Sequence, residues 1–169
     1  MRLVQEHGKT TILRDLIRNL SSGIKDFKFK AINVAVVDER GEIAALYKGK
    51  PQNNLGVKTD ILENVSKSIG IKMLVRCMSP KVIVADEIGG KGDTEAINYA
   101  VCSGVKGIFT AHGSSLEELY LNPMMKELIG INVIERIIFL DENRKGNIKS
   151  VYYLDKKNKE YIFMENVWK

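Results

Sequence analysis

Two kinds of hydrophobic pattern alternate along the chain. Between residues 10 and 22 the apolar side chains recur every three or four positions, which predicts a helix that ends at Ser21-Ser22-Gly23. Residues 31–37 (AINVAVV) instead form a continuous apolar run rich in β-branched residues, which predicts a buried strand. A polar, glycine-bearing connection over residues 38–58 follows this strand.

The same alternation continues to residue 129 and then changes. A helix is predicted between a cap at Ser66 and a stop at Pro80, and another from Asp93 to Ser103 with Gly104 as its terminator. Short apolar runs predict strands over 82–85 and 107–111 and, without intervening helices, over 137–140, 151–154 and 161–164. Helical spacing also marks residues 116–120 and 124–129, which are separated near Pro123.

This order of elements predicts an α/β fold with a mostly parallel sheet, helices on both faces and an antiparallel C-terminal extension. A chain of 169 residues suits a single domain, here residues 1–169, and its hydrophobic content of 44% is ordinary for a globular protein. No apolar run approaches the roughly 20 residues that span a bilayer, and no leader peptide is evident, so we expect a cytoplasmic protein. Cys77 and Cys102 are predicted to be buried in a reducing compartment.

The net charge of +5 suits nucleic acid, an anionic membrane surface or a phosphorylated ligand. Lysines are locally dense at residues 25–30 and 156–159, and we interpret both segments as solvated surface. No aromatic series for base stacking is evident among the basic residues, which argues against a nucleic-acid partner. A nucleic-acid-binding protein stays open as an alternative.

Polar, titratable residues follow three of the predicted strands. Asp38-Glu39-Arg40 follows the first, Asp86-Glu87 the second, and His112 the third. Parallel strands bring their carboxyl ends to one edge of a sheet, where ligands bind. With Lys9 at the start of the first helix, we expect Lys9, Asp38, Asp86 and His112 to converge within a few ångströms.

Residues of these types, at the strand ends and at the start of the first helix, suit hydrolysis of a nucleoside triphosphate. Gly8-Lys9-Thr10 matches the end of the phosphate-binding pattern G-x-x-x-x-G-K-[ST], in which helix amides hold phosphate oxygens. Lys9 would neutralise the terminal phosphates of ATP, and the Thr10 hydroxyl would ligate Mg²⁺. Asp86, after four apolar residues, would hold the magnesium shell, as a Walker B aspartate does.

The remaining candidates act on the reaction itself. Glu87 would polarise the attacking water as a general base, and His112 would sense the terminal phosphate. Arg40 and Arg76 could each supply positive charge to the transition state, in their own site or in a neighbour's. The first glycine of the pattern should be residue 3, which is Leu, so the front of the phosphate loop is missing or remodelled.

Three long segments carry a family resemblance. Residues 37–62 (VDERGEIAALYKGKPQNNLGVKTDIL), 73–97 (MLVRCMSPKVIVADEIGGKGDTEAI) and 107–119 (GIFTAHGSSLEEL) resemble the stage III sporulation protein AA family of endospore-forming bacteria. That family belongs to the secretion and pilus-motor ATPases, and the resemblance covers nearly all of residues 8–140. It implies a RecA-like P-loop core that hydrolyses ATP with Mg²⁺.

The resemblance also assigns motifs. Gly8-Lys9-Thr10-Thr11 resembles the end of the Walker A loop, and Asp38-Glu39-Arg40 the acidic box, so Thr11, Asp38 and Glu39 join the expected nucleotide-binding residues. Asp86-Glu87 resembles the Walker B pair and Thr110 to Gly113 the histidine box.

Assembly and partners are implied in the same way. The family resemblance implies a hexameric ring with nucleotide between subunits, located in the mother-cell cytoplasm. The ring would be held at the membrane by channel proteins and would serve the channel between mother cell and forespore. The family also carries an N-terminal domain and a complete loop. We therefore expect this chain to be truncated, able to exist as a monomer, and weak or inactive in turnover. A catalytically dead scaffold is the alternative.

Overall fold

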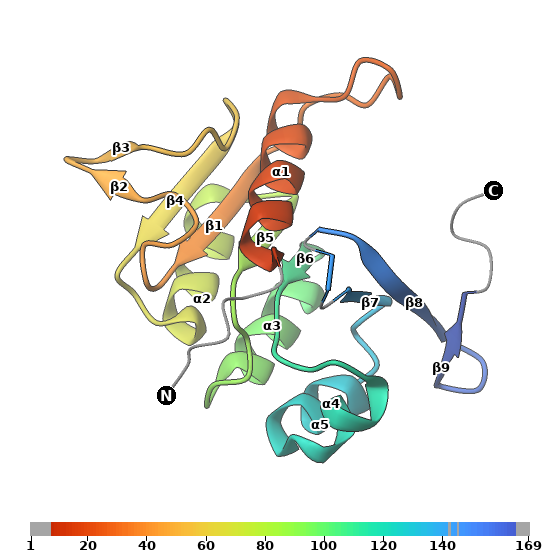
Figure 1. Cartoon of the computed structure of the whole chain (residues 1–169). Coiled ribbons are helices and arrows are strands. Elements are labelled where there is room, and N and C mark those ends of the chain that lie inside the picture. Colours follow the sequence, from red (N-terminus) through yellow and green to blue (C-terminus); the bar gives the residue numbers. More distant parts are fainter. Residues whose placement is uncertain (1–7, 142, 145, 165–169) are drawn as a thin grey trace. The chain divides into compact units, whose positions relative to one another are not determined.

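The computed structural model describes residues 8–141, 143–144 and 146–164 (Figure 1). These residues divide into two compact units. One comprises Thr10–Ala111, and the other comprises Gly8 and Lys9 together with the described residues from His112 onward.

A four-stranded parallel sheet forms the centre of the Thr10–Ala111 unit. Its strands lie in the order β4 (Thr59–Glu63), β1 (Val34–Asp38), β5 (Val82–Ala85) and β6 (Lys106–Phe109). All three pairings are parallel, and every residue of β1 and β5 is buried. Two central strands buried on both faces explain the continuous apolar runs in the sequence, and the parallel core of the predicted fold is confirmed.

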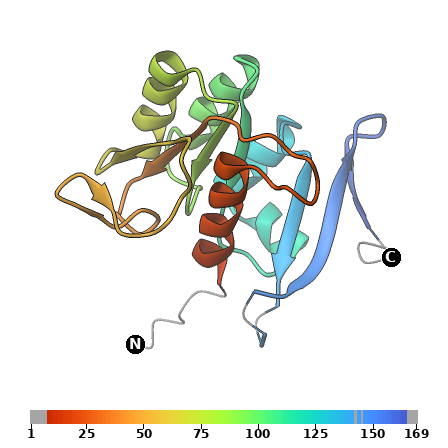
Figure 2. The ribbon, with the colours of Figure 1, turned by 90° about the horizontal axis from the view of Figure 1, so that it is seen from above.

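Helices cover both faces of this sheet, as Figure 2 shows. On one face, α1 (Lys9–Ser22) buries Leu13 and Ile17 in a cluster with Val34 and Val84 of the central strands. On the other face, α2 (Lys67–Met78) packs against β1, β4 and β5, and α3 (Asp93–Cys102) packs against β6. The alternating side chains of β1 therefore face different helices, as the pleat requires.

Three strands of this unit were not predicted. Strand β4 is an edge strand with the sequence TDILE, which has only two apolar residues, and all five of its residues are half-buried. The predicted polar connection also contains a small antiparallel hairpin, β2 (Leu46–Tyr47) and β3 (Lys50–Pro51). Strands of two residues are too short to leave a periodic pattern.

The prediction for the cysteines is wrong, because Cys77 and Cys102 are both exposed. Each lies in the last turn of its helix, at the end of α2 and of α3, where the helix leaves the sheet. Cysteine is usually buried, but residues in the last turn of a helix can lie outside its buried face, and the sequence around these two does not show this.

The second unit begins with two short helices, α4 (Leu116–Leu121) and α5 (Pro123–Gly130). Asn122 caps α5 and Pro123 occupies its first turn, so the predicted break lies where the sequence indicates. Strands β7 (Arg136–Leu140), β8 (Ile148–Asp155) and β9 (Glu160–Phe163) follow as an antiparallel sheet, which confirms the predicted extension. Among the described residues, no helix is both long and apolar enough to cross a membrane.

Candidate functional site

Asp38 is the last residue of β1, and its side chain is fully buried. Its carboxylate accepts hydrogen bonds from the backbone N–H groups of Ile43, at 3.1 Å, and Ala44, at 2.7 Å. These contacts fold the chain back immediately after the strand, since a buried carboxylate requires such donors. Asp38 therefore shapes the loop that carries Glu39 and Arg40.

Asp86 follows β5, the strand that pairs directly with β1. It is only 3% exposed, and among the described residues its Oδ2 atom has no hydrogen-bond partner. Burial raises the pKa of Asp86 above its usual value, and the neighbouring charge of Asp38 raises it further. The charge of Lys67 acts in the opposite direction on this pKa. A buried carboxylate with an open oxygen is a binding position for a cation or a donor.

Glu87 is held in an uncommon backbone conformation directly after Asp86. Its φ is +45°, in the left-handed region that glutamate seldom adopts. Its backbone N–H donates to Oγ1 of Thr110 at 2.9 Å, and its carboxylate forms an ion pair with Arg40. Strain of this kind persists only where neighbours enforce it, and it collects at functional sites.

Asp93 fixes the loop that follows Glu87. Its Oδ2 atom accepts hydrogen bonds from the backbone N–H groups of Gly89, at 3.1 Å, and Gly90, at 2.8 Å. The sequence analysis missed this role. An aspartate in the first turn of a helix, three residues after a glycine pair, is the signal that could have indicated it.

Lys67 is a second residue that the sequence analysis missed. It is the first residue of α2 and only 7% exposed, and its ammonium group pairs with the carboxylate of Glu39. A lysine at the positive end of a helix opposes the helix dipole, so acidic neighbours must compensate it. That position in the sequence, directly after the predicted cap Ser66, was the available signal. Ser66 is the N-cap residue, but its side chain makes no capping hydrogen bond.

Gly8, Lys9 and Thr10 lie at the start of α1, as predicted for the end of a phosphate loop. Gly8 has a φ of +79° and the helix begins at Lys9. The Lys9 Nζ atom lies 3.4 Å from Nδ1 of His112. Thr10 is half-buried in the first turn of the helix, and the following Thr11 is exposed.

The expected convergence of four side chains thus resolves into two observed pairs. Lys9 meets His112, and the charges of Asp38 and Asp86 interact. These pairs belong to different compact units, so the meeting of all four stays a prediction. The segment that would carry the front of the phosphate loop, residues 1–7, lies outside the described residues.

Arg76 lies apart from these carboxylates. It is in the last turn of α2, about 13 Å along the helix axis from Lys67 at 1.5 Å per residue. Its Nε atom donates to the Tyr99 hydroxyl at 3.2 Å. Arg76 therefore does not reach the Asp86 region of its own chain, and a role in a neighbouring subunit stays a prediction.

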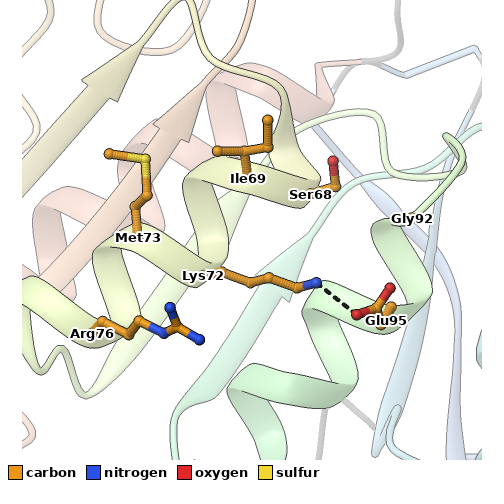
Figure 3. Close-up of a pocket in the computed structure, with 7 residues that line it drawn as sticks. All are labelled: Ser68, Ile69, Lys72, Met73, Arg76, Gly92 and Glu95. Carbon is orange, nitrogen blue, oxygen red and sulfur yellow. Dashed lines mark hydrogen bonds and ion pairs between the residues drawn. The ribbon is translucent and has the colours of Figure 1, made fainter.

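A shallow hollow of about 400 Å³ lies between α2 and α3 (Figure 3). An ion pair of 2.7 Å between Lys72 and Glu95 crosses it. The hollow is lined by Ser68, Ile69, Lys72, Met73, Arg76, Gly92 and Glu95. It contains none of the residues at the strand ends, so we place the candidate site at those ends.

The residues at the strand ends fit a magnesium ion that is bound partly through other ligands. Among the described residues there is no cluster of three or more side chains that would hold a metal alone. Magnesium in nucleotide sites uses one or two protein oxygens, with water and phosphate completing its shell. The open Oδ2 atom of Asp86 and the hydroxyl of Thr10 are oxygen ligands of the required kind.

Solved structures show the class of fold to which this arrangement belongs. The ATPase DotB of Legionella pneumophila matches 92% of this chain and 44% of its own, with a TM-score of 0.62 and 14% identity. The VirB11 ATPase of the Brucella suis type IV secretion system, solved with sulphate, matches 88% of this chain and 47% of its own, with a TM-score of 0.51 and 15% identity. The fold is that of the RecA-like secretion ATPases.

Within that class the chain belongs to the family described as sporulation stage III, protein AA, which matches residues 4–160. The stage III sporulation protein AA of Bacillus subtilis is 38% identical over 149 residues. That alignment covers 88% of this chain and 48% of the relative, so the chain spans about half the length of that protein. The SEEDLING PLASTID DEVELOPMENT 1 protein of Arabidopsis thaliana is 27% identical over 89% of this chain and 21% of its own length.

Proposed function

We propose that this chain is the nucleotide-binding part of a sporulation ATPase that binds and hydrolyses ATP with Mg²⁺. The observation that carries the proposal is the buried Asp86 carboxylate, whose Oδ2 atom has no partner among the described residues, with Glu87 fixed beside it. The secretion ATPases named above share the fold, and the family match places the chain among sporulation proteins. The same family supports the further proposal of a ring that serves the mother cell–forespore channel from the mother-cell side.

Each residue of the proposed site has a separate role in ATP binding or hydrolysis. The helix start at Gly8 and Lys9 binds the phosphates, with Thr10 and Asp86 holding the ion. Bound Mg²⁺ would neutralise phosphate charge in the transition state. Glu87 accepts a proton from the attacking water once Arg40 releases its carboxylate. Arg40 is then available to stabilise charge on the phosphates. His112, next to Lys9, is positioned to report the presence of the terminal phosphate.

The test uses Lys9→Ala and Glu87→Gln in a protein of the length that the Bacillus subtilis relative has. Each change is expected to lower ATP turnover by roughly a hundredfold or more, since each removes charge stabilisation or base catalysis. Glu87→Gln should retain nucleotide binding, whereas Lys9→Ala should weaken it. Lys126→Ala is a matched control for Lys9→Ala, because Lys126 is an exposed lysine of α5 and lies outside the residues assigned to the site. Unchanged turnover in both test variants would refute the assignment.

Calorimetry with ATP and Mg²⁺ tests the 169-residue chain itself. Heat of binding that is lost in Lys9→Ala supports the site. Absence of heat at high protein concentration would instead support a scaffold that uses the fold without nucleotide.

A further inference from the structure

A basic loop with exposed aromatic residues connects α1 to β1. It spans residues 25–30 (KDFKFK), within one of the two segments where lysines are locally dense. We call it the KDFKFK loop. Phe27 and Phe29 alternate with Lys28 and Lys30, so the expectation that no aromatic residues interleave with the basic ones is wrong for this segment.

The loop is an ordered hairpin turn. Ile24 and Phe29 exchange two backbone hydrogen bonds of 3.0 Å each, and the Lys28 N–H donates to the Lys25 carbonyl at 3.0 Å. Gly23 permits the reversal, because a Cβ atom there would lie 2.9 Å from the Phe29 carbonyl oxygen. Asp26 and Phe27 are therefore held at the apex of the turn.

An exposed apolar side chain lies at the apex of the turn and is flanked by lysines. The Phe27 side chain is 81% exposed, and Lys25, Lys28 and Lys30 are all exposed, with Asp26 as the acidic residue among them. A second apolar side chain lies near the base of the loop. Val57 is 87% exposed, and the Nζ atom of the adjoining Lys58 donates to the carbonyl of Ala31 at 3.3 Å.

The KDFKFK loop lies near the amino ends of the parallel strands, whereas Asp38 and Asp86 lie at the carboxyl ends of β1 and β5. Helix α1 begins at the phosphate-binding end and finishes at Ser22, and the loop leads from there to the amino end of β1 at Val34. Figure 1 shows the loop in orange, projecting beyond the end of α1. A partner can therefore occupy the surface at the amino ends of the strands while nucleotide is bound at their carboxyl ends.

We propose that the KDFKFK loop binds the surface of an anionic lipid bilayer, with Phe27 entering the interface and the lysines contacting lipid phosphates. Apolar side chains flanked by lysines favour such interfaces, where the charged heads remain in water. The aliphatic Val57 suits acyl chains and cannot stack on a nucleic-acid base as an aromatic side chain does. The absence of arginine from the loop also favours lipid over a nucleic-acid partner, which arginine recognises by stacking.

Vesicle flotation of the 169-residue protein, in the absence of nucleotide, tests this proposal. The protein is expected to float with phosphatidylcholine vesicles that contain about one-third phosphatidylglycerol, and to stay behind with pure phosphatidylcholine. Because each lysine near an anionic surface strengthens binding roughly fivefold, Lys25→Gln/Lys28→Gln should lower partitioning about 25-fold, and added salt should lower it too. Phe27→Ser should lower it at unchanged charge.

Two controls separate the loop from the general basic charge. Lys48→Gln/Lys50→Gln removes the same two charges from the hairpin of β2 and β3, which also carries the exposed Tyr47, and should leave partitioning within about twofold. In Phe27→Trp, the new tryptophan emission should shift to the blue with anionic vesicles, after subtraction of the parent protein that contains Trp168.

Two outcomes would overturn the proposal. One is equal partitioning of the loop variants and the β2–β3 control. The other is failure to bind anionic vesicles, and loop-dependent binding of a single-stranded oligonucleotide would then identify nucleic acid as the partner. Neither outcome depends on ATP hydrolysis, so the proposed function is tested separately.

Discussion

Asp86 is a carboxylate that the fold buries beside a second carboxylate, Asp38. Ionised Asp86 is therefore costly in the folded chain, and its raised pKa expresses that cost. A binding site often retains such a group at the expense of stability.

The first prediction is that Asp86→Asn stabilises the chain at neutral pH by about 1–3 kcal/mol, the usual range for a buried polar group without a partner. Because the folded-state pKa is raised, the wild-type chain loses relative stability as pH rises through the titration of Asp86, and the gain in the variant should fade as pH falls towards the ordinary aspartate value. Thermal melting at a series of pH values measures this. A variant that melts lower at every pH contradicts the prediction.

Lys67 carries the second prediction at this scale. Its ammonium group neutralises Glu39 and lowers the pKa of Asp86, so Lys67→Met leaves acidic groups without compensation. We expect a loss of about 1–3 kcal/mol in denaturant unfolding, since Glu39 is partly exposed and can rehydrate. Lys72→Met is the matched control. Its partner Glu95 is largely exposed, so Lys72→Met should unfold at nearly the same denaturant concentration as the parent chain.

At the scale of elements, the contact between α2 and the sheet depends on Gly70. A Cβ atom at this position would lie 2.7 Å from Cγ1 of Val37 in β1. Val37 is buried and has a β-branched side chain with few rotamers, so it cannot move aside at low cost. The glycine lets helix and strand approach closely despite its poor helix propensity.

The third prediction follows. Gly70→Ala should destabilise the chain by about 1–3 kcal/mol through overpacking, although alanine favours helices. Gly130→Ala, near the end of α5, is the control, because a Cβ atom there meets nothing within 4 Å. That change should be neutral or stabilising by up to about 1 kcal/mol. Chemical denaturation of both variants distinguishes packing from propensity, and equal effects would show that packing at Gly70 does not matter.

At the scale of the whole molecule, the Thr10–Ala111 unit contains a hydrophobic core of its own. The buried cluster of α1, β1 and β5 lies entirely within this unit. The described part of the other unit relies on a smaller antiparallel sheet, in which Tyr152 packs edge-on against Phe139 and Phe163. In that unit the Tyr161 hydroxyl donates to the Ile134 carbonyl at 2.7 Å, and burial raises the pKa of Tyr161 to about 12.

The fourth prediction is that residues 8–111 fold without the remainder of the chain. A separate core should give cooperative unfolding, as is usual for small domains with a packed interior. Circular dichroism during urea titration would show a single sigmoidal transition. A gradual loss of signal would indicate that the core needs residues 112–164. The single-domain prediction from the sequence remains open to this same experiment.

The sequence alone determined the order of helices and central strands and the candidate chemistry at their ends. Buried parallel strands and amphipathic helices leave apolar patterns that can be read locally, and Gly8-Lys9-Thr10 and Asp86-Glu87 are short contiguous motifs. Strand β4 was missed because this half-buried edge strand has only two apolar residues and so leaves neither a continuous apolar run nor an alternating pattern. Only the tertiary structure decided the partners of Lys67 and Asp93, the left-handed backbone of Glu87 and the exposure of Cys77 and Cys102. These properties depend on which residues distant along the chain approach one another, and local periodicity carries no information about those contacts.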